Sequence, residues 1–272
     1  MSSPIRGCYV DTAWGQVHAL RAGTSGPWIG LFHESPLSSQ VFVQVLEHLA
    51  PHARAVAFDT PGYGASTPPD GPTHDIPEYA AVLSEAAGRL GMDDAVFAGV
   101  HTGASIAIEV AHVFPAGVAG VVLSGVALYD EEERAAHIAG WTPKVPADVD
   151  GAQFRWVVER YQRIWPDLSS ELLHTAAVEL LRVKDRYDWG YQAAFRHDPA
   201  GPLAALEVPV LLLDAEFDLL ADKDATAMEL ARDVRLEILK GLPGQPHLRA
   251  PATYARHVLD FARNHAAEGA AP

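Results

Sequence analysis

Three strand-length stretches of apolar or alternating residues open the chain, and short polar or glycine-rich turns separate them. These stretches cover residues 6–12, 16–22 and 27–33. Such pieces, bounded by turn residues, predict β-strands. After residue 33 the period changes, because apolar side chains then recur three and four positions apart, at Phe42, Val45, Leu46 and Leu49. This spacing predicts an amphipathic helix.

From residue 54 onward, apolar strand-length runs alternate with segments of helical period. The runs cover residues 54–59, 95–100, 117–123, 209–213 and 235–239, and the helical segments cover residues 76–90, 103–114, 221–234 and 250–264. Strands that alternate with helices are typical of an α/β fold, in which helices cover both faces of a mostly parallel, doubly wound sheet. We therefore predict such a sheet, with about eight strands.

Residues 130–199 interrupt this alternation, because they show helical patterning without a convincing core strand. Four of the six tryptophans lie in this interval, together with several tyrosines and phenylalanines. An aromatic helical insertion between two strands predicts a lid over a pocket, carried by a core domain of residues 1–129 and 200–272. Most of these aromatic side chains are expected to attach the lid to the core. Four are assigned to the pocket wall: Trp141, Trp156, Trp189 and Tyr191.

Composition narrows the class of protein. With 272 residues, 49% of them hydrophobic and 20% charged, the chain has material for one large core, which argues against disorder and a coiled coil. The single cysteine, Cys8, excludes a disulfide framework and a multi-cysteine metal site. The formal net charge of −15 makes nucleic acid a poor partner. Because there is no bilayer-length apolar run and no secretory signal, we expect a cytoplasmic protein without a membrane partner.

Polar residues follow four of the predicted strands at the point where each strand ends. They are residues 33–36, 59–66, 99–103 and 214–218, and His247 stands just before the last predicted helix. The carboxyl ends of parallel strands meet at one edge of a sheet, where the binding sites of such folds lie. The sequence therefore predicts a single site that gathers these segments.

In this order and spacing, the segments resemble those of α/β-hydrolase-fold proteins, and the resemblance covers nearly all of the chain. His33-Glu34-Ser35-Pro36 resembles the oxyanion loop of that family, and Gly99-Val100-His101-Thr102-Gly103 falls at its G-x-S-x-G nucleophile elbow, a sharp turn from strand to helix. Asp218 and His247 stand where the family carries its acid and its general base. The chain also closely resembles a sub-group with His-Thr-Gly at the elbow. The resemblance implies a hydrolase-type enzyme with a metal-free, triad-like site and no cofactor.

The elbow holds His101 where the family has a nucleophilic serine, so the serine mechanism does not carry over. The start of a helix disfavours an imidazolium, which predicts a neutral His101 ring that acts as nucleophile or general base. We expect Asp218 to accept a hydrogen bond from His247, whose other ring nitrogen then faces His101.

Three further positions belong to this predicted site. The backbone N–H groups of Ser35 and Thr102 are the candidate oxyanion donors, and both survive the change at the elbow. Glu34 stands where many family members have glycine, and we expect its carboxylate to point away from the pocket. A carboxylate that points inward adds a third acid or base to the site.

Three functions fit this pattern. The first is a cofactor-independent hydrolase that cleaves an ester, a lactone or an activated C–C bond of a small molecule, which the aromatic lid predicts to be apolar or aromatic. The second is a lyase, isomerase or decarboxylase that moves protons between two histidines. The third is a ligand-binding protein without catalysis. Metal-binding and nucleotide-binding signatures are missing from the sequence, so we expect no metal and no nucleotide cofactor. Oligomeric state is left open, with a homodimer as one arrangement.

Overall fold

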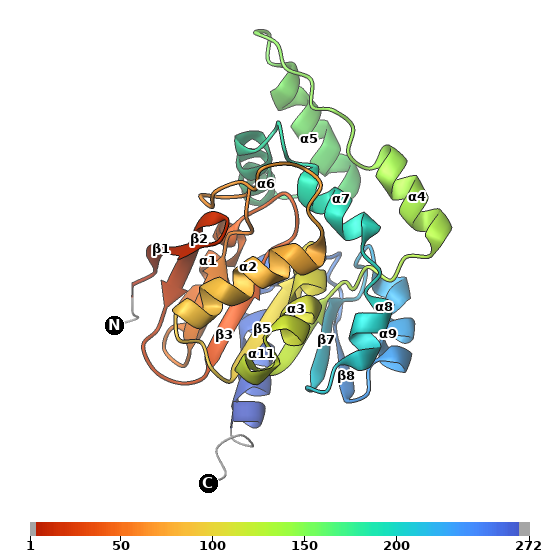
Figure 1. The fold of residues 1–272 in the computed structure, drawn as a ribbon. Coiled ribbons are helices and arrows are strands. Elements are labelled where there is room, and N and C mark those ends of the chain that lie inside the picture. The colour runs from red at the N-terminus through yellow and green to blue at the C-terminus, as the bar shows by residue number, and fades with distance from the viewer. Residues whose placement is uncertain (1–3, 267–272) are drawn as a thin grey trace.

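One eight-stranded sheet forms the centre of the computed structural model, which describes residues 4–266 (Figure 1). The strands lie in the order β1-β2-β4-β3-β5-β6-β7-β8. The first two pairings, β1 with β2 and β2 with β4, are antiparallel, and every other pairing is parallel. The bounds are Arg6–Thr12, Gly15–Ala22, Trp28–Phe32, Arg54–Phe58, Ala95–Val100, Val118–Ser124, Val210–Ala215 and Val234–Leu239 for β1 to β8. The prediction of a mostly parallel sheet with about eight strands is confirmed.

The central strands are apolar on both faces because helices cover both sides of the sheet. Every residue of β5 is buried, and its successive side chains enter different cores. Val96 packs into the core that includes α1 (Val43–Leu49) and α11 (Pro251–Ala266). Phe97 packs into the opposite core, which includes α2 (Ile76–Arg89) and α3 (Thr102–Val113). A strand buried on both faces loses the apolar–polar alternation that β1, at the sheet edge, retains.

The helix expected over residues 221–234 is shorter than predicted. A 3₁₀ turn, Ala221–Lys223, leads into α9, Asp224–Leu230, and β8 begins at Val234. The Val210 N–H donates to the Asp233 carbonyl oxygen (2.8 Å), which holds the chain extended beside β7. Pairing with the sheet therefore ends the helical period before residue 234.

Between β6 and β7 the chain forms five helices, and the first four lie together beyond one end of the sheet (Figure 1). These are α4 (Glu131–Gly140), α5 (Ala152–Ile164), α6 (Ser170–Arg182) and α7 (Trp189–Arg196). The fifth, α8 (Ala200–Ala205), packs beside α3 and α9 in the core. We call α4–α7 the lid. The division into a core and a separate unit of residues 130–199 stays a prediction.

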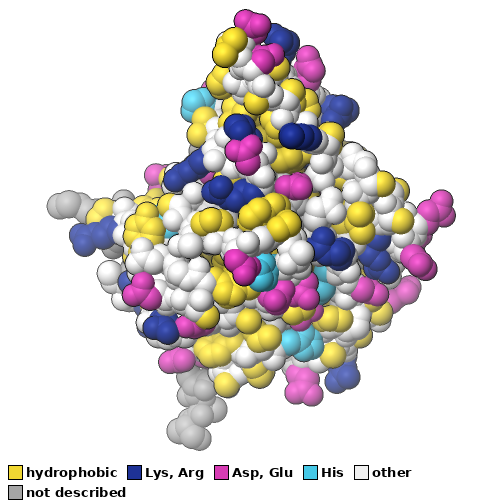
Figure 2. Space-filling view, turned by 45° about the horizontal axis from the view of Figure 1, so that its top comes forward, with side chains coloured by type: hydrophobic (Ala, Val, Ile, Leu, Met, Phe, Trp, Pro, Cys, Tyr) yellow, Lys and Arg dark blue, Asp and Glu magenta, His cyan; other side chains and the backbone are white. Residues whose placement is uncertain are grey.

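Hydrogen bonds to buried side chains tie the lid to the core. Tyr63 accepts from the Gly190 N–H (2.6 Å) and donates to the Tyr187 carbonyl oxygen (3.3 Å). His197, at the end of α7, pairs with Glu109 of α3 (2.7 Å). On the face shown in Figure 2, acidic and basic side chains are interspersed. Within residues 4–266, every helix is too short or too polar to cross a membrane.

Candidate active site

His101 stands on the turn between β5 and α3, in a backbone conformation that few side chains adopt. Its φ is 48° and its ψ is −109°, and its N–H donates to the Ser124 carbonyl oxygen (2.8 Å). The two glycines around it are sterically required. A Cβ on Gly99 would lie 2.0 Å from the Gly103 carbonyl oxygen, and a Cβ on Gly103 would lie 2.1 Å from the Phe32 carbonyl oxygen. The sequence G-x-H-x-G therefore builds the same sharp turn that the serine version requires.

The His101 ring forms an ion pair with Asp218. Its Nε2 lies 3.0 and 3.2 Å from the two carboxylate oxygens, and the Leu220 N–H donates to Oδ1 (3.0 Å). Burial favours the uncharged imidazole, but the charge and hydrogen bond of Asp218 outweigh it and raise the pKa of His101 to about 9. Burial likewise opposes ionisation of Asp218, and the adjacent His101 overcomes it and lowers the pKa of that carboxyl. At neutral pH the pair is an imidazolium and a carboxylate.

The expectation of a neutral ring at the elbow is therefore wrong. The partial charge of a helix N-terminus disfavours the imidazolium, but a full carboxylate charge 3.0 Å from His101 favours it more strongly. The sequence placed His101 and Asp218 in one site correctly, but it did not predict that they contact each other directly.

His247 pairs with Glu34 and not with Asp218. It is fully buried on the short helix α10 (Pro246–Arg249), and its Nε2 lies 3.3 Å from Glu34 Oε2. The expected hydrogen bond from His247 to Asp218 is not formed, because the His247 Nε2 faces Glu34 and Asp218 binds His101 instead. The histidine predicted as general base thus has a different carboxylate beside it.

Glu34 points into the pocket, against the expectation, and only 4% of the residue is exposed. Burial opposes its ionisation, but His247 and, more weakly, His101 outweigh that effect and lower the pKa of the Glu34 carboxyl. Neither carboxylate oxygen accepts a hydrogen bond from any group in residues 4–266. The pocket wall therefore includes a buried carboxylate that has His247 beside it and no strong hydrogen bond to another group of residues 4–266.

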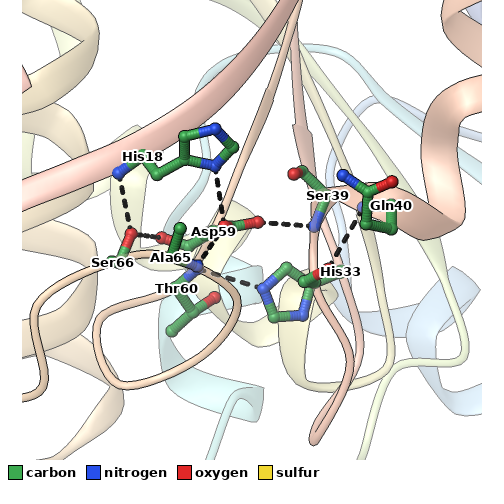
Figure 3. A network of polar contacts seen from close by, with 9 residues as sticks. His18, His33, Ser39, Gln40, Asp59, Thr60, Ala65 and Ser66 are labelled. Carbon is green, nitrogen blue, oxygen red and sulfur yellow. Dashed lines mark hydrogen bonds and ion pairs between the residues drawn. The ribbon is translucent and has the colours of Figure 1, made fainter. Parts of the chain in front are cut away.

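A network beneath the pocket fixes the loop that carries Glu34 and Ser35 (Figure 3). His33, which follows β3, accepts a hydrogen bond at Nε2 from the Thr60 N–H (3.0 Å). Its ring proton is then on Nδ1, which donates to the Glu34 carbonyl oxygen (2.9 Å). The His33 ring thereby links the oxyanion loop to the turn after β4.

Asp59, which follows β4, connects three further segments in the same network (Figure 3). Its carboxylate accepts from the N–H groups of Ser39 (2.7 Å) and Ala65 (2.8 Å), and it lies 2.8 Å from Nδ1 of His18. Burial opposes the charge, but these contacts together lower the pKa of Asp59. The carboxylate is therefore used in holding loops together and is not available to a substrate.

Two backbone donors are free at the polar end of the pocket. Ser35 and Thr102 both line it, and Thr102 is the first residue of α3, where helix geometry leaves the N–H without an intrahelical acceptor. Within the part of the chain that the structure describes, neither N–H donates to another group. Both N–H groups are therefore available as donors, and their use as an oxyanion hole stays a prediction.

The pocket lies between the core and the lid and is partly open to solvent. Its polar end is formed by His101, Glu34, Ser35, Thr102 and Gln245. Its remaining wall is almost entirely apolar or aromatic and comes mainly from the lid: Ala127, Tyr129, Trp141, Tyr161, Ile164, Trp165, Tyr191, Ala194, Phe195, Leu219 and Leu220.

The sequence identified the aromatic lid but only part of the pocket wall. Trp141 and Tyr191 line the pocket, whereas Trp156 and Trp189 do not. Trp156 packs instead against the ring of Tyr187 at a centroid distance of 5.7 Å. The lining residues that were missed include Tyr161 and Trp165, four positions apart at the end of α5, and Phe195, four positions after Tyr191 on α7. This spacing of four could have identified, from the sequence, which face of each lid helix lines the pocket.

Within residues 4–266, we find no cluster of three His, Cys, Asp or Glu side chains that could hold a metal ion. Behind and at the pocket surface, two ion pairs form, His101 with Asp218 and Glu34 with His247. These pairs give the site one protonated imidazole and one carboxylate at the same pocket surface. Such an arrangement can move protons to and from a ligand without a cofactor.

Comparison with known proteins places this chain in a family. Residues 17–265 match the alpha/beta hydrolase family. Haloalkane dehalogenase 2 of Mycobacterium tuberculosis is 34% identical over 120 residues, which are 44% of this chain and 42% of that protein. The pimeloyl-[acyl-carrier protein] methyl ester esterase of Nitrosospira multiformis is 24% identical over 261 residues, covering 88% of this chain and 95% of the esterase.

Solved structures agree on the fold. Epoxide hydrolase A from Mycobacterium thermoresistibile superposes with a TM-score of 0.78 over 96% of this chain and 98% of that one, at 19% sequence identity. The match to the dehalogenase spans less than half of either protein, whereas the family match extends from β2 to α11. The sheet order, the elbow after β5 and the helical insertion after β6 fit this assignment. The chain belongs to the alpha/beta hydrolase family.

Proposed function

We propose that this protein is a cofactor-independent hydrolase of small, largely apolar esters or lactones, from a sub-group that carries histidine at the nucleophile elbow. The supporting observation is the contact between His101 and Asp218 at 3.0 Å, which makes the elbow residue an imidazolium at neutral pH. A protonated ring is a poor nucleophile and a good acid. We therefore assign proton donation to His101 and base catalysis to the carboxylate of Glu34.

The proposed reaction uses groups that line the pocket. The substrate carbonyl oxygen accepts hydrogen bonds from the N–H groups of Ser35 and Thr102. Glu34, with His247 behind it, takes a proton from a water molecule whose oxygen bonds to the carbonyl carbon. The C–O bond to the leaving group then breaks as His101 gives that oxygen its Nδ1 proton. Nε2 stays bonded to Asp218, and the proton on Glu34 returns to His101 through solvent.

Dehalogenation is the second candidate, because the local similarity to haloalkane dehalogenase 2 reaches 34% identity. In that reaction the Glu34 carboxylate would displace halide from carbon, and water would then hydrolyse the resulting ester. Proton transfer without hydrolysis, as in a lyase or isomerase, uses the same acid and base. The products distinguish these reactions. Ester hydrolysis gives a carboxylic acid and an alcohol, dehalogenation gives a halide ion, and a lyase or isomerase gives a cleaved or isomerised ligand without added water.

The test combines a substrate panel with three variants. We expect hydrolysis of p-nitrophenyl and benzyl esters without halide release from brominated alkanes. His101→Asn, which tolerates the backbone conformation at the elbow, and Glu34→Gln should each lower kcat/KM by about a hundredfold or more. The exposed His52→Asn is the matched control and should behave like the parent.

The pH profile tests the assigned roles. Because His101 must keep its proton, kcat/KM should fall as the pH rises through about 9, the value to which Asp218 raises the pKa of His101. A rate that rises through the same range would make His101 a base and overturn the assignment. Full activity of His101→Asn, or halide release as the main reaction, would overturn the proposed ester hydrolysis.

A further inference from the structure

Arg160 of α5 is a buried cation that no carboxylate neutralises. Only 3% of the residue is exposed, and it forms no ion pair with any described residue from 4 to 266. Its Nη1 donates to the Trp141 carbonyl oxygen (3.0 Å), whereas Nε and Nη2 are buried without a partner. The guanidinium carbon lies 5.6–5.8 Å from the ring centroids of Trp141, Trp156, Tyr187 and Tyr191.

The aromatic rings around Arg160 explain in part how its buried charge is stabilised. Ring faces attract a cation and, because they are apolar, they also remove water from it. They do not accept the two free N–H groups in the way that a carboxylate does. A buried guanidinium with unused donors is costly, so a purely structural role leaves Nε and Nη2 unexplained.

These unused donors lie beside the pocket already described. Trp141 and Tyr191 flank Arg160 and also line the pocket. Tyr161, the next residue in the chain, lines it too, and its hydroxyl is buried without a partner. Trp141 Nε1 is a further buried donor, and both Trp141 and Arg160 interact with the Tyr191 hydroxyl. Hydrogen-bond donors and the Arg160 charge therefore lie directly behind the aromatic wall at the lid end of the pocket.

The opposite end of the pocket carries the acid–base machinery, including the Glu34 carboxylate. Tyr161 and Tyr191 lie within the fields of both charges, since Glu34 raises and Arg160 lowers the pKa of each hydroxyl, alongside the larger effect of burial. At that end the His101 charge is paired with Asp218, so an anionic group on a ligand is repelled by Glu34 and attracted by Arg160. The charge distribution along the pocket thus favours one orientation of a charged ligand.

We propose that Arg160 is a specificity-determining residue that binds a carboxylate on the substrate, at the end remote from the bond that reacts. The substrate class is then an aromatic or apolar ester that also carries a free carboxylate. The part of this inference that concerns ester cleavage rests on the proposed function, whereas the binding of a carboxylate by Arg160 does not. Arg160 acts in binding and orientation, while His101 and Glu34 act on the bond.

The test measures ligand binding in the His101→Asn protein, so that it does not depend on turnover. Phenylacetate and its neutral counterpart phenylacetamide are titrated and followed by tryptophan fluorescence. We expect phenylacetate to bind at least about tenfold more tightly. Arg160→Met should abolish this preference and Arg160→Lys should retain part of it, while Arg163→Met, an exposed arginine on the same helix, should leave it unchanged.

Two outcomes would overturn the inference. One is equal binding of the two probes to the His101→Asn protein, which needs no change at Arg160 and is therefore decisive even if Arg160→Met does not fold. The other is a preference that survives in a folded Arg160→Met protein, as judged by its circular dichroism. Loss of esterase activity in His101→Asn has no bearing on either outcome, so failure of the proposed hydrolysis remains distinguishable.

Discussion

His101 and His247 each have a carboxylate beside them, and which carboxylate is paired with which ring decides their chemistry. His101 contacts Asp218 at 3.0 Å, and His247 lies 3.3 Å from Glu34. The family pattern led us to expect Asp218 beside His247. Glu34, at a position where that pattern often has glycine, places a second negative charge beside His247. The imidazole of His101 meanwhile forms the ion pair with Asp218. The two departures from the family pattern, glutamate at position 34 and histidine at position 101, thus together determine which carboxylate each histidine pairs with.

This coupling predicts how a serine at the elbow would behave. His101→Ser alone should give little esterase activity, because His247 remains paired with Glu34 and cannot serve the new serine as a base oriented by Asp218. The double variant His101→Ser with Glu34→Gly frees both His247 and Asp218. We expect it to hydrolyse p-nitrophenyl acetate at least about tenfold faster than either single variant, with burst kinetics from an acyl-enzyme. Strict additivity of the two changes would contradict the coupling.

At the scale of single elements, the hydrophobic pattern predicted the strands well because each central strand is buried on both faces and so reads as an apolar run. Contacts that depend on side-chain direction were not predictable. The pattern could not say that Glu34 points inward, because that follows from the fixed loop in which His33 holds the Glu34 carbonyl oxygen. Nor could the pattern say where the helix after residue 221 ends. Its end is determined by the hydrogen bond between Asp233 and Val210, which begins the pairing of β8 with β7.

The elbow is the element whose geometry depends most on glycine. Gly103→Ala should lower the free energy of unfolding by more than about 3 kcal/mol, because its Cβ would lie 2.1 Å from the Phe32 carbonyl oxygen. Gly88→Ala is the matched control near the exposed end of α2, where a Cβ has no atom within 4 Å. It should raise the free energy of unfolding by about 1 kcal/mol. Urea denaturation measures both, and equal effects would contradict the steric account.

On the scale of the whole molecule, the pocket exists only where lid and core meet. The core contributes the charged residues His101 and Glu34, and the lid contributes the aromatic wall and the nearby charge of Arg160. Buried contacts such as Tyr63 with Gly190 and His197 with Glu109 hold the two parts together. The pairs His101–Asp218 and Glu34–His247 join segments that are far apart in the sequence, so the ionisation of the site is linked to the folded state of the core.

That linkage predicts a pH dependence of global stability. The pKa of His101 is about 9 in the folded protein, whereas histidine in an unfolded chain has its ordinary pKa of about 6.5, so the folded state binds the proton more tightly. The stabilisation is fully present below about pH 6.5 and is lost as the pH rises through about 9. Between pH 6 and 10, the unfolding free energy of the parent should fall relative to that of His101→Asn by an amount on the order of 3 kcal/mol. Subtracting the two urea curves cancels the titration of tyrosines and lysines common to both. A difference that stays constant with pH would mean that Asp218 does not hold His101 in its charged form.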